Sequence, residues 1–253
     1  MGKKILIINA DDLGYDPAVS RGIFEAMRGG VVSSATLMVN SPHAEPAAAS
    51  ASGLSIGLHF NLARFAPVWS DFPDALLVGG ELSESIADQL PAKVVEQEAL
   101  AQLDLLEAML GRPATHLDAH KHLHHWPAVF DGVCAAAKAR GLPVRSIDGR
   151  MRQALRKRGI ATADAFIGDA GQEPYWTLTR FRRAIAELSD EATELMCHPG
   201  YPPTAVASGY SLQREVELQT FLHPSAPLLL RQAGVTLADY TALRGWTKGS
   251  GLR

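Results

Sequence analysis

The chain has 253 residues, of which 47% are hydrophobic and 20% are charged, so it can bury a large core and is not disordered throughout. Its formal net charge of -3 and pI near 6.3 lack the basic excess of nucleic-acid-binding proteins. No stretch is long and apolar enough for a membrane span, the apolar run 5–8 is too short for a signal peptide, and two cysteines make no disulfide framework. These features predict a cytoplasmic protein that uses neither nucleic acid nor a transmembrane segment.

Short apolar runs predict strands, and segments with helical spacing of apolar residues lie between them. The expected strands are 4–10, 34–40, 54–60, 115–120, 142–147, 163–168, 193–197 and 235–240. The expected helices are 17–28, 42–50, 91–110, 127–140, 150–158, 177–188, 211–221 and 226–232. Between 63 and 90 no clean period appears, and a loop of that length inside a compact domain usually has a function, here as a rim over a substrate.

Strands that alternate with helices predict a parallel α/β fold. Seven or eight strands favour a single (β/α) barrel, regular or distorted, over an open sheet. The barrel is expected to occupy residues 1–245 as one catalytic domain, followed by a disordered tail at 246–253. The first strand is not followed by the glycine pattern G-x-G-x-x-G, which counts against a dinucleotide site.

Five of the nine histidines lie in the stretch from Thr115 to His125. In an extended strand side chains alternate, so positions 116, 118, 120, 122 and 124 would project His, Asp, His, His and His from one face. Imidazoles beside a carboxylate are good ligands for a divalent metal. The alternatives are a surface histidine tract with adventitious metal affinity and histidines scattered on a polar loop, and the regular pattern favours a functional site over both.

Polar residues without an evident structural role lie at the C-terminal ends of four predicted strands: Asp11 with Asp12, His59, the histidine cluster and His198. In a (β/α) barrel this is the face where catalytic residues collect. A carboxylate and two imidazoles can hold a metal that activates water, a second carboxylate can take the proton of that water, and a further histidine can protonate a leaving group. The residues therefore predict metal-assisted hydrolysis of an amide or ester. An Asx turn at Asp11 and Asp12 and a core histidine at His59 are the structural alternatives.

Four segments, in order, resemble the motifs of the YdjC-type carbohydrate deacetylases, which include chitooligosaccharide and hopanoid-associated deacetylases. They are Asn9-Ala10-Asp11-Asp12-Leu13-Gly14, Gly57-Leu58-His59-Phe60-Asn61-Leu62, the stretch from Pro113 to His124, and Cys197-His198-Pro199-Gly200-Tyr201. The similarity covers residues 3–240, with mild departures at Leu13, Ala119 and Lys121. The resemblance implies a barrel of the glycoside hydrolase/deacetylase superfamily and one divalent metal ion held by Asp12, His59 and His120.

We therefore predict a metal-dependent hydrolase that removes the N-acetyl group from an acetylated amino sugar, a chitooligosaccharide or a related glycoconjugate. Asp11 is expected to act as the base toward metal-bound water, and His198 as the acid toward the departing amine. Two rivals remain: a metal-dependent amidohydrolase or phosphoesterase with a non-sugar substrate, and a catalytically silent carbohydrate-binding barrel. The intact Asp11-Asp12 pair counts against the silent barrel, because a binding module needs no proton acceptor beside a metal ligand.

The substrate is expected to be a small carbohydrate, and the oligomeric state is open. The candidate substrate-binding residues are Asn61, His122, His124 and Tyr201. His116 and Asp118 are expected to orient a metal ligand. Two imidazoles and one carboxylate suit Zn²⁺, whereas Mg²⁺ prefers oxygen, so either ion remains a candidate cofactor. Lys121 and the loop that begins at Ala63 are expected to influence the choice of substrate.

Overall fold

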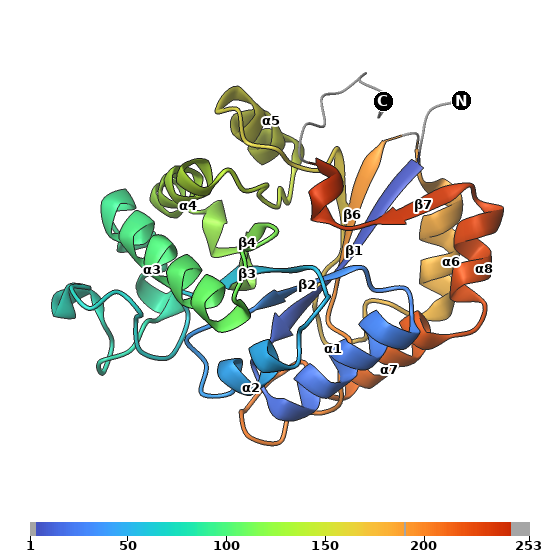
Figure 1. Cartoon of the computed structure of the whole chain (residues 1–253), viewed down its shortest axis with the longest axis horizontal. Coiled ribbons are helices and arrows are strands. Elements are labelled where there is room, and N and C mark those ends of the chain that lie inside the picture. The colour runs from blue at the N-terminus through green and yellow to red at the C-terminus, as the bar shows by residue number, and fades with distance from the viewer. Residues whose placement is uncertain (1–3, 190, 244–253) are drawn as a thin grey trace.

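The computed structural model describes residues 4–189 and 191–243 and shows parallel strands surrounded by helices (Figure 1). Within these residues the strands pair in the order β4-β3-β2-β1-β6-β5, and β7 pairs with β1. The strands are β1 Lys4–Leu13, β2 Ser34–Leu37, β3 Ile56–Phe60, β4 Leu117–Ala119, β5 Ala165–Ile167, β6 Ala192–Cys197 and β7 Val235–Ala238. Every one of these pairings is parallel, as the alternation of elements predicts.

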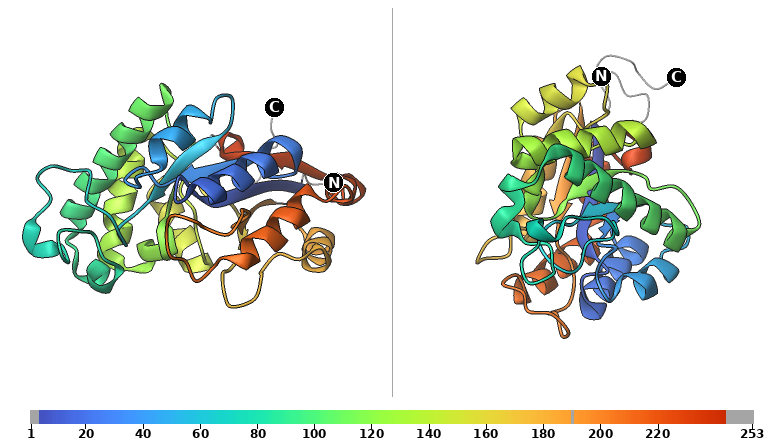
Figure 2. Two further views of the ribbon diagram at one scale, coloured as in Figure 1. Left: turned by 90° about the horizontal axis from the view of Figure 1, so that it is seen from below. Right: turned by 90° about the vertical axis from the view of Figure 1, so that its left-hand side faces the viewer.

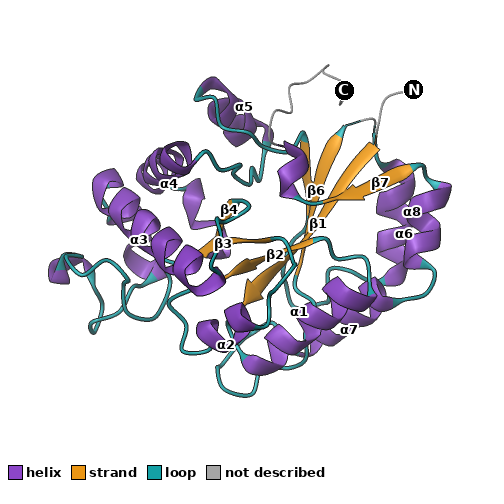
Figure 3. Cartoon of the chain, in the orientation of Figure 1, coloured by secondary structure: helices purple, strands orange, loops and turns teal. Residues whose placement is uncertain are grey.

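The helices of the described chain lie on the outside of the strands (Figures 2 and 3). The α-helices are α1 Pro17–Gly29, α2 Ala44–Ala49, α3 Ala92–Leu110, α4 Pro127–Arg140, α5 Gly149–Lys157, α6 Leu178–Glu187, α7 Leu212–Leu222 and α8 Ala226–Gln232. Short 3₁₀ helices are η1 Asp74–Leu76, η2 Glu84–Gln89, η3 His120–His125 and η4 Tyr240–Leu243. In Figure 1, α1 lies beside α7, and α3 lies beside α4.

β1 is the strand around which the others are arranged. Its residues Ile5–Ala10 pair with β6, whereas Lys4–Ile7 pair with β7 and Asn9–Leu13 pair with β2. β2 and β7 therefore share the edge of β1 that is opposite β6, one along each half of the strand. Both faces of β1 are covered, since every residue from Ile5 to Leu13 is buried, which explains its near-continuous apolar run.

The sheet is an incomplete barrel, and a closed barrel of seven or eight strands is not what the pairing shows. β4 and β5 are the two ends of the paired path. Between them lies the segment 142–147, which the sequence predicts as a strand but which forms a single bridge, between Val144 and Leu117. Pro143 has no N–H to donate, so this segment cannot continue a regular ladder beside β4.

Two strand boundaries differ from the sequence prediction in a way that matters for the site. β1 continues to Leu13, so Asp11 and Asp12 lie inside the strand and not after it. β4 stops at Ala119, and the next residues form η3, in which Lys121 and His122 both have φ of 54°. A left-handed backbone at two successive residues ends the alternation of side chains. The histidines after Ala119 therefore do not continue the strand face that carries Asp118.

Apolar side chains between the strands and the helices form the core, and a smaller apolar cluster lies at the N-terminal end of β1. In the described residues no helix is long and apolar enough to cross a membrane. The predicted tail at 246–253 lies outside the described residues.

The long segment after β3 is anchored to α3 by buried polar residues. Glu98 of α3 accepts hydrogen bonds from the backbone N–H groups of Val68 and Trp69, each at 2.9 Å. Gln102, one turn further along α3, donates to the carbonyl oxygen of Asn61 at 2.9 Å and accepts from its N–H at 3.1 Å. These bonds satisfy backbone groups that would otherwise be buried without partners, and they fix where the segment leaves the sheet.

Two glycines of α1 test how tightly this helix packs near the C-terminal end of β6. A Cβ atom at Gly22 would lie 2.6 Å from Gly200 Cα, whereas one at Gly29 would lie 3.6 Å from the Leu222 side chain. We expect Gly22→Ala to lower the free energy of unfolding by about 1–3 kcal/mol, because two backbones must separate. The control Gly29→Ala should change it by less than about 0.5 kcal/mol. Urea unfolding of both variants measures the difference, and equal stabilities would show that α1 can move away from Gly200 without cost.

Candidate metal centre

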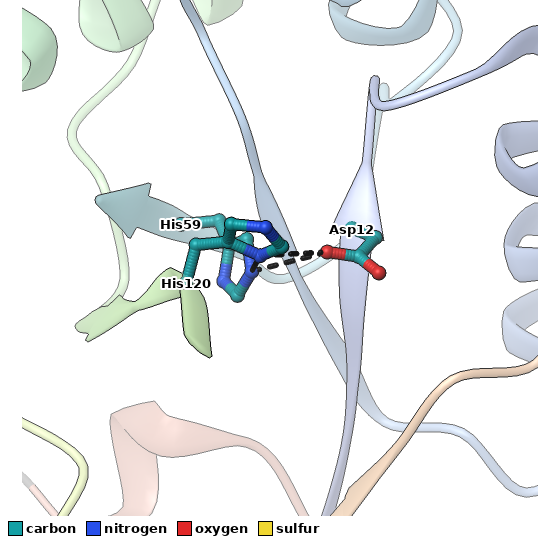
Figure 4. A group of neighbouring side chains, drawn as sticks. All are labelled: Asp12, His59 and His120. Carbon is teal, nitrogen blue, oxygen red and sulfur yellow. Dashed lines mark hydrogen bonds and ion pairs between the residues drawn. The ribbon is translucent and has the colours of Figure 1, made fainter. Parts of the chain in front are cut away.

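Asp12, His59 and His120 bring three ligand atoms together at the C-terminal ends of β1, β3 and β4 (Figure 4). Asp12 Oδ1 lies 3.2 Å from His59 Nε2 and 3.2 Å from His120 Nδ1, and the two nitrogens are 3.1 Å apart. Ligand atoms ~2.0–2.1 Å from a tetrahedral ion are separated from one another by about 3.3 Å. The three atoms therefore have the spacing of one face of a tetrahedral site.

The chemistry of these atoms also fits a cation. In the described chain Asp12 Oδ1 is buried and has no hydrogen bond of good geometry, although both imidazoles are close to it. Buried atoms whose lone pairs point at one another are unfavourable unless a proton or a cation lies between them. A divalent ion would satisfy the oxygen and both nitrogens at once, and zinc in proteins takes this combination of ligands.

A β-bulge in β1 explains how the side chains of two consecutive aspartates both face the same cavity. The register of β1 against β2 shifts between Ala10 and Leu13, and Asp12 has φ of 70°. In a regular strand Asp11 and Asp12 would point to opposite faces, so the bulge redirects the second side chain. Aspartate is among the few residues with a Cβ that adopt this backbone conformation at low cost.

The second oxygen of Asp12 is occupied by Arg214 of α7. Arg214 Nη2 donates to Asp12 Oδ2 at 2.6 Å, and both side chains are buried. Burial alone would raise the pKa of Asp12, but Arg214 and the two imidazoles lower it well below its usual range. Asp12 is therefore ionised and has one oxygen, Oδ1, that faces His59 and His120.

His59 is oriented by Asp118 of β4. Its Nδ1 donates to Asp118 Oδ1 at 2.6 Å, and Thr36 of β2 donates to Asp118 Oδ2 at 2.9 Å, which leaves His59 Nε2 toward Asp12. Burial alone would lower the pKa of His59, but Asp118 and Asp12 raise it to about 10. A carboxylate that holds the outer nitrogen of an imidazole is a common partner of metal ligands.

Asp11 is held by Arg145, a buried residue that contacts three carboxylates. Arg145 Nη1 and Nη2 donate to the two oxygens of Asp11 at 2.6 and 2.7 Å. Arg145 also lies 3.0 Å from Asp118 Oδ2 and 2.7 Å from Glu194 Oε1. Burial alone would raise the pKa of Asp11, but Arg145 lowers it below its usual range. Asp11 is therefore ionised at neutral pH and fixed in place.

A cavity of about 390 Å³ lies beside the three candidate ligands and has Asp11 and His198 in its wall. His198 follows β6 directly, and its Nδ1 is buried without a hydrogen bond in the described chain. Burial lowers the pKa of His198 to about 4, despite the nearby charges of Asp12 and Asp11. His198 is therefore neutral at pH 7 and lies in the same cavity as the carboxylate of Asp11.

Only one of the four predicted substrate-binding residues lies in the wall of the cavity. His122 lines the cavity, whereas Asn61, His124 and Tyr201 are outside its wall. Asn61 is buried and donates to Asn40 Oδ1 and to the carbonyl oxygen of Arg64. His124 is fully buried because η3 turns it inward.

Tyr201 lies against α1 and not in the cavity. After Pro199 and Gly200 the chain turns toward this helix, and the Tyr201 O–H donates to Glu25 at 2.7 Å. His116 was expected to orient a metal ligand, but its hydrogen bonds and ring contact in the described chain involve none of Asp12, His59 and His120. It hydrogen-bonds to Asn9 Oδ1 at 3.0 Å, and its ring stacks on Tyr240.

Several residues of the site were not predicted from the sequence. They are Tyr15, Arg64, Tyr210 and Arg214 in the cavity wall, and Arg145 and Glu217 behind it. Arg145 lies near the end of the predicted strand 142–147, the same kind of position that drew attention to Asp11 and His59. Arg214 and Glu217 are charged residues on the face of helix 211–221 that also buries Leu218 and Phe221. A charge among core-facing residues is the signal that could have found them.

Fold and site together define an α/β protein with a two-histidine, one-carboxylate centre at the C-terminal ends of parallel strands. The chain belongs to the YdjC-like protein family, whose model matches residues 5–232.

Two curated relatives are similar over nearly the whole chain. A carbohydrate deacetylase from Geobacillus stearothermophilus is 36% identical, over 92% of this chain and 96% of the relative. A chitooligosaccharide deacetylase from Serratia marcescens is 34% identical, over 95% of this chain and 100% of the relative.

Solved structures share the fold. The crystal structure of a putative cellobiose-phosphate cleavage protein from Enterococcus faecalis V583 is 27% identical, with a TM-score of 0.83 over 95% of this chain and 99% of that chain. The Xyl-CE4 domain of a multidomain xylanase from the hindgut metagenome of Trinervitermes trinervoides is 8% identical, with a TM-score of 0.53 over 95% of this chain and 89% of that chain. The second likeness concerns the fold alone.

The pKa of His59 predicts how metal binding depends on pH. Without metal, the ring carries a proton on both nitrogens below its pKa of about 10, and Nε2 must lose its proton before it can bind an ion. Burial lowers the pKa of His120, so that ring has no proton to lose at pH 7. We expect about one proton to be released per ion, and the affinity to rise about tenfold per pH unit between about pH 6 and 8. Calorimetric titration in buffers of different ionisation enthalpy measures both quantities. An affinity independent of pH would show that His59 is neutral before the ion binds.

Proposed function

We propose that this chain is a metal-dependent hydrolase that removes the N-acetyl group from an acetylated amino sugar, such as a chitooligosaccharide or a related glycoconjugate. The observation that carries the proposal is the convergence of Asp12, His59 and His120 beside a cavity that also presents Asp11 and His198. The names of relatives that are 36% and 34% identical support the same chemistry.

Asp12, His59 and His120 would hold one divalent ion, and two nitrogens with one oxygen favour Zn²⁺ over the harder Mg²⁺. When bound, such an ion acidifies water and polarises the acetyl carbonyl. The chain fixes two of these three ligands independently of the ion, because Arg214 holds Asp12 and Asp118 holds His59. The site therefore needs little rearrangement to receive the metal.

Asp11 is proposed as the base that accepts the proton of the attacking water. Oδ1 of its carboxylate accepts from both Arg145 and Asn9, whereas Oδ2 accepts from Arg145 alone and keeps a lone pair that can take a proton. The same guanidinium makes Asp11 a weak base, so the proton transfer depends on how acidic the water is. Arg145 thus fixes the position of Asp11 and sets its basicity.

His198 is proposed as the acid that protonates the departing nitrogen. An amine is a poor leaving group unless it receives a proton in the transition state, and histidine is the usual donor near neutral pH. With a pKa of about 4, His198 is neutral and must first gain a proton. Asp11 lines the same cavity, so the proton that it takes from water can pass to His198 and on to the nitrogen.

We propose that residues of the cavity wall and of the segment after β3 determine which substrate binds. Lys121 lines the cavity and forms an ion pair with Glu84 of η2, which joins that segment to the site. Tyr15 and Tyr210 offer aromatic rings in the same wall. We further propose that residues 1–245 work as one catalytic domain in the cytoplasm, on a small carbohydrate.

Acetate release tests the proposed function. The metal-free protein, prepared with a chelator and then given Zn²⁺ or Mg²⁺, is incubated with a panel of acetylated amino sugars and their oligomers. Acetate should form only with metal, and from at least one sugar of the panel. Release from simple non-sugar acetamides at the same rate would favour a general amidohydrolase, and sugar binding without acetate release would favour a silent binding barrel.

Variants of the adjacent carboxylates separate their roles. Asp11→Asn should keep the metal and lose turnover by ~10²–10⁴-fold, because an amide cannot accept a proton. Asp12→Asn should weaken metal binding first, because it removes the charge of one of three protein ligands. Metal content by elemental analysis and acetate release decide between them. If Asp11→Asn keeps full turnover, the base is another group, and His198 becomes the candidate.

Replacing His198 should matter most for a poor leaving group. We expect His198→Ala to keep its metal and to lose ~10²–10⁴-fold in turnover on the acetamide. The loss on an acetyl ester with a good leaving group should be much smaller, since such a group hardly needs protonation. His125→Ala is a matched control, because His125 is exposed and lies outside the cavity wall. Equal losses on amide and ester would make His198 a substrate-binding residue and not the acid.

A further inference from the structure

Glu217 of α7 is a fully buried carboxylate whose hydrogen-bond partners all belong to the region around His198. Its Oε1 accepts hydrogen bonds from the Tyr210 O–H at 2.5 Å and from the backbone N–H of Trp176 at 3.3 Å. Its Oε2 accepts a hydrogen bond from the backbone N–H of His198 at 2.6 Å. These three donors come from segments far apart in the sequence. One side chain therefore joins the end of β6, the loop before α7 and the loop before α6.

Glu217 has no cation in direct contact, and the more distant charge of Arg214 offsets its charge only in part. In residues 4–189 and 191–243 no lysine, arginine or histidine forms an ion pair with it. Burial raises the pKa of Glu217 to about 7. A buried carboxylate without an ionic partner is costly, and a neutral acceptor could hold a loop at a lower cost. All three partners are donors, however, and three donors are what a carboxylate accepts best. The geometry of His198 therefore depends on a group that is unfavourable for stability alone.

The same helix supports the other side of the site. Arg214, three residues before Glu217, lies on the same face of α7 and donates to the Tyr210 carbonyl oxygen at 2.9 Å and to Asp12 Oδ2 at 2.6 Å. Tyr210 is thus held at its hydroxyl by Glu217 and at its carbonyl by Arg214. Its ring lies 5.3 Å from the ring of His198 and lines the cavity. The position of His198 relative to Asp12 is fixed through two adjacent turns of one helix.

We propose that Glu217 is a positioning residue that holds His198 where its imidazole can protonate the leaving nitrogen. The inference rests on the proposed role of His198 as the acid. Glu217 does not line the cavity, so it acts through the His198 backbone and the Tyr210 ring. A glutamine at this position can direct its oxygen to the His198 N–H and its amide to the Tyr210 hydroxyl, which can accept as well as donate. Glutamine should therefore replace glutamate in part, and alanine should not.

The first experiment compares Glu217→Ala, Glu217→Gln and the control Glu215→Gln, which lies on the exposed face of the same helix. Metal content, melting temperature and turnover on the acetamide and on an activated acetyl ester are measured for each. Glu217→Ala should keep its metal and lose ~10–10²-fold on the amide, as expected when a catalytic group is misplaced, with a much smaller loss on the ester. Glu217→Gln should recover part of that loss, and Glu215→Gln should match the wild type. If the alanine variant does not fold, the glutamine variant carries the comparison.

A double-mutant cycle shows whether Glu217 acts through His198. If it does, His198→Ala with Glu217→Gln should turn over the amide no more slowly than His198→Ala alone, because the group to be positioned is already gone. A further loss equal to that of the single Glu217 variant would overturn the inference, and so would equal losses on amide and ester in the Glu217 variants. Failure of the acid role itself has a different signature, since His198→Ala would then lose equally on both substrates.

Discussion

One buried guanidinium makes the charge arrangement around β1 possible. Asp11, Asp118 and Glu194 all lie within 3.0 Å of Arg145, and all four side chains are buried. Carboxylates this close would repel one another strongly where water is excluded, and the fixed positive charge of arginine offsets that repulsion. Because Asp118 also orients His59, the same guanidinium stabilises the candidate metal ligand and the proposed base.

A second buried arginine, Arg214, likewise holds a carboxylate in place on the other side of the candidate centre. Arg214 holds the outer oxygen of Asp12, as Asp118 holds the outer nitrogen of His59. Each of these two ligand residues therefore has its free atom selected by a partner on a different element of the fold. Pre-set ligands lose little conformational freedom when an ion binds, so more of the binding energy appears as affinity.

The sequence was sufficient to bring Asp12, His59 and His120 to one place, because parallel strands deliver their last residues to a common edge. It could not separate His120 from its neighbours by alternation, since the left-handed backbone of Lys121 and His122 breaks the strand period there. The motif resemblance made that selection. The extent of β1 also differs from the prediction, because the strand runs through both aspartates and beyond the bulge.

The supporting residues were beyond local patterns for physical reasons. Arg145 meets Asp11 across a separation of 134 residues, and Pro143 beside it prevents the regular strand that would have marked its position. The direction of Tyr201 depends on how the turn at Pro199 and Gly200 packs against α1, which is a tertiary contact. Charged residues facing the core of α7 carry a readable signal, but their partners lie on other elements and cannot be named from the helix alone.

Because the long segment after β3 is anchored to α3, its length can change in evolution without moving the candidate metal ligands. Glu98 fixes its start, and none of the three candidate ligands lies on it, so its middle can lengthen or shorten without disturbing them. Chain entropy opposes such changes only weakly, since doubling the length of a loop costs roughly 0.6 kcal/mol. Selection can therefore change the length of this segment, which supplies Arg64 to the cavity wall, while the charged residues of the site keep their positions. A scaffold of this kind can accept insertions at its edge without moving the residues at its centre.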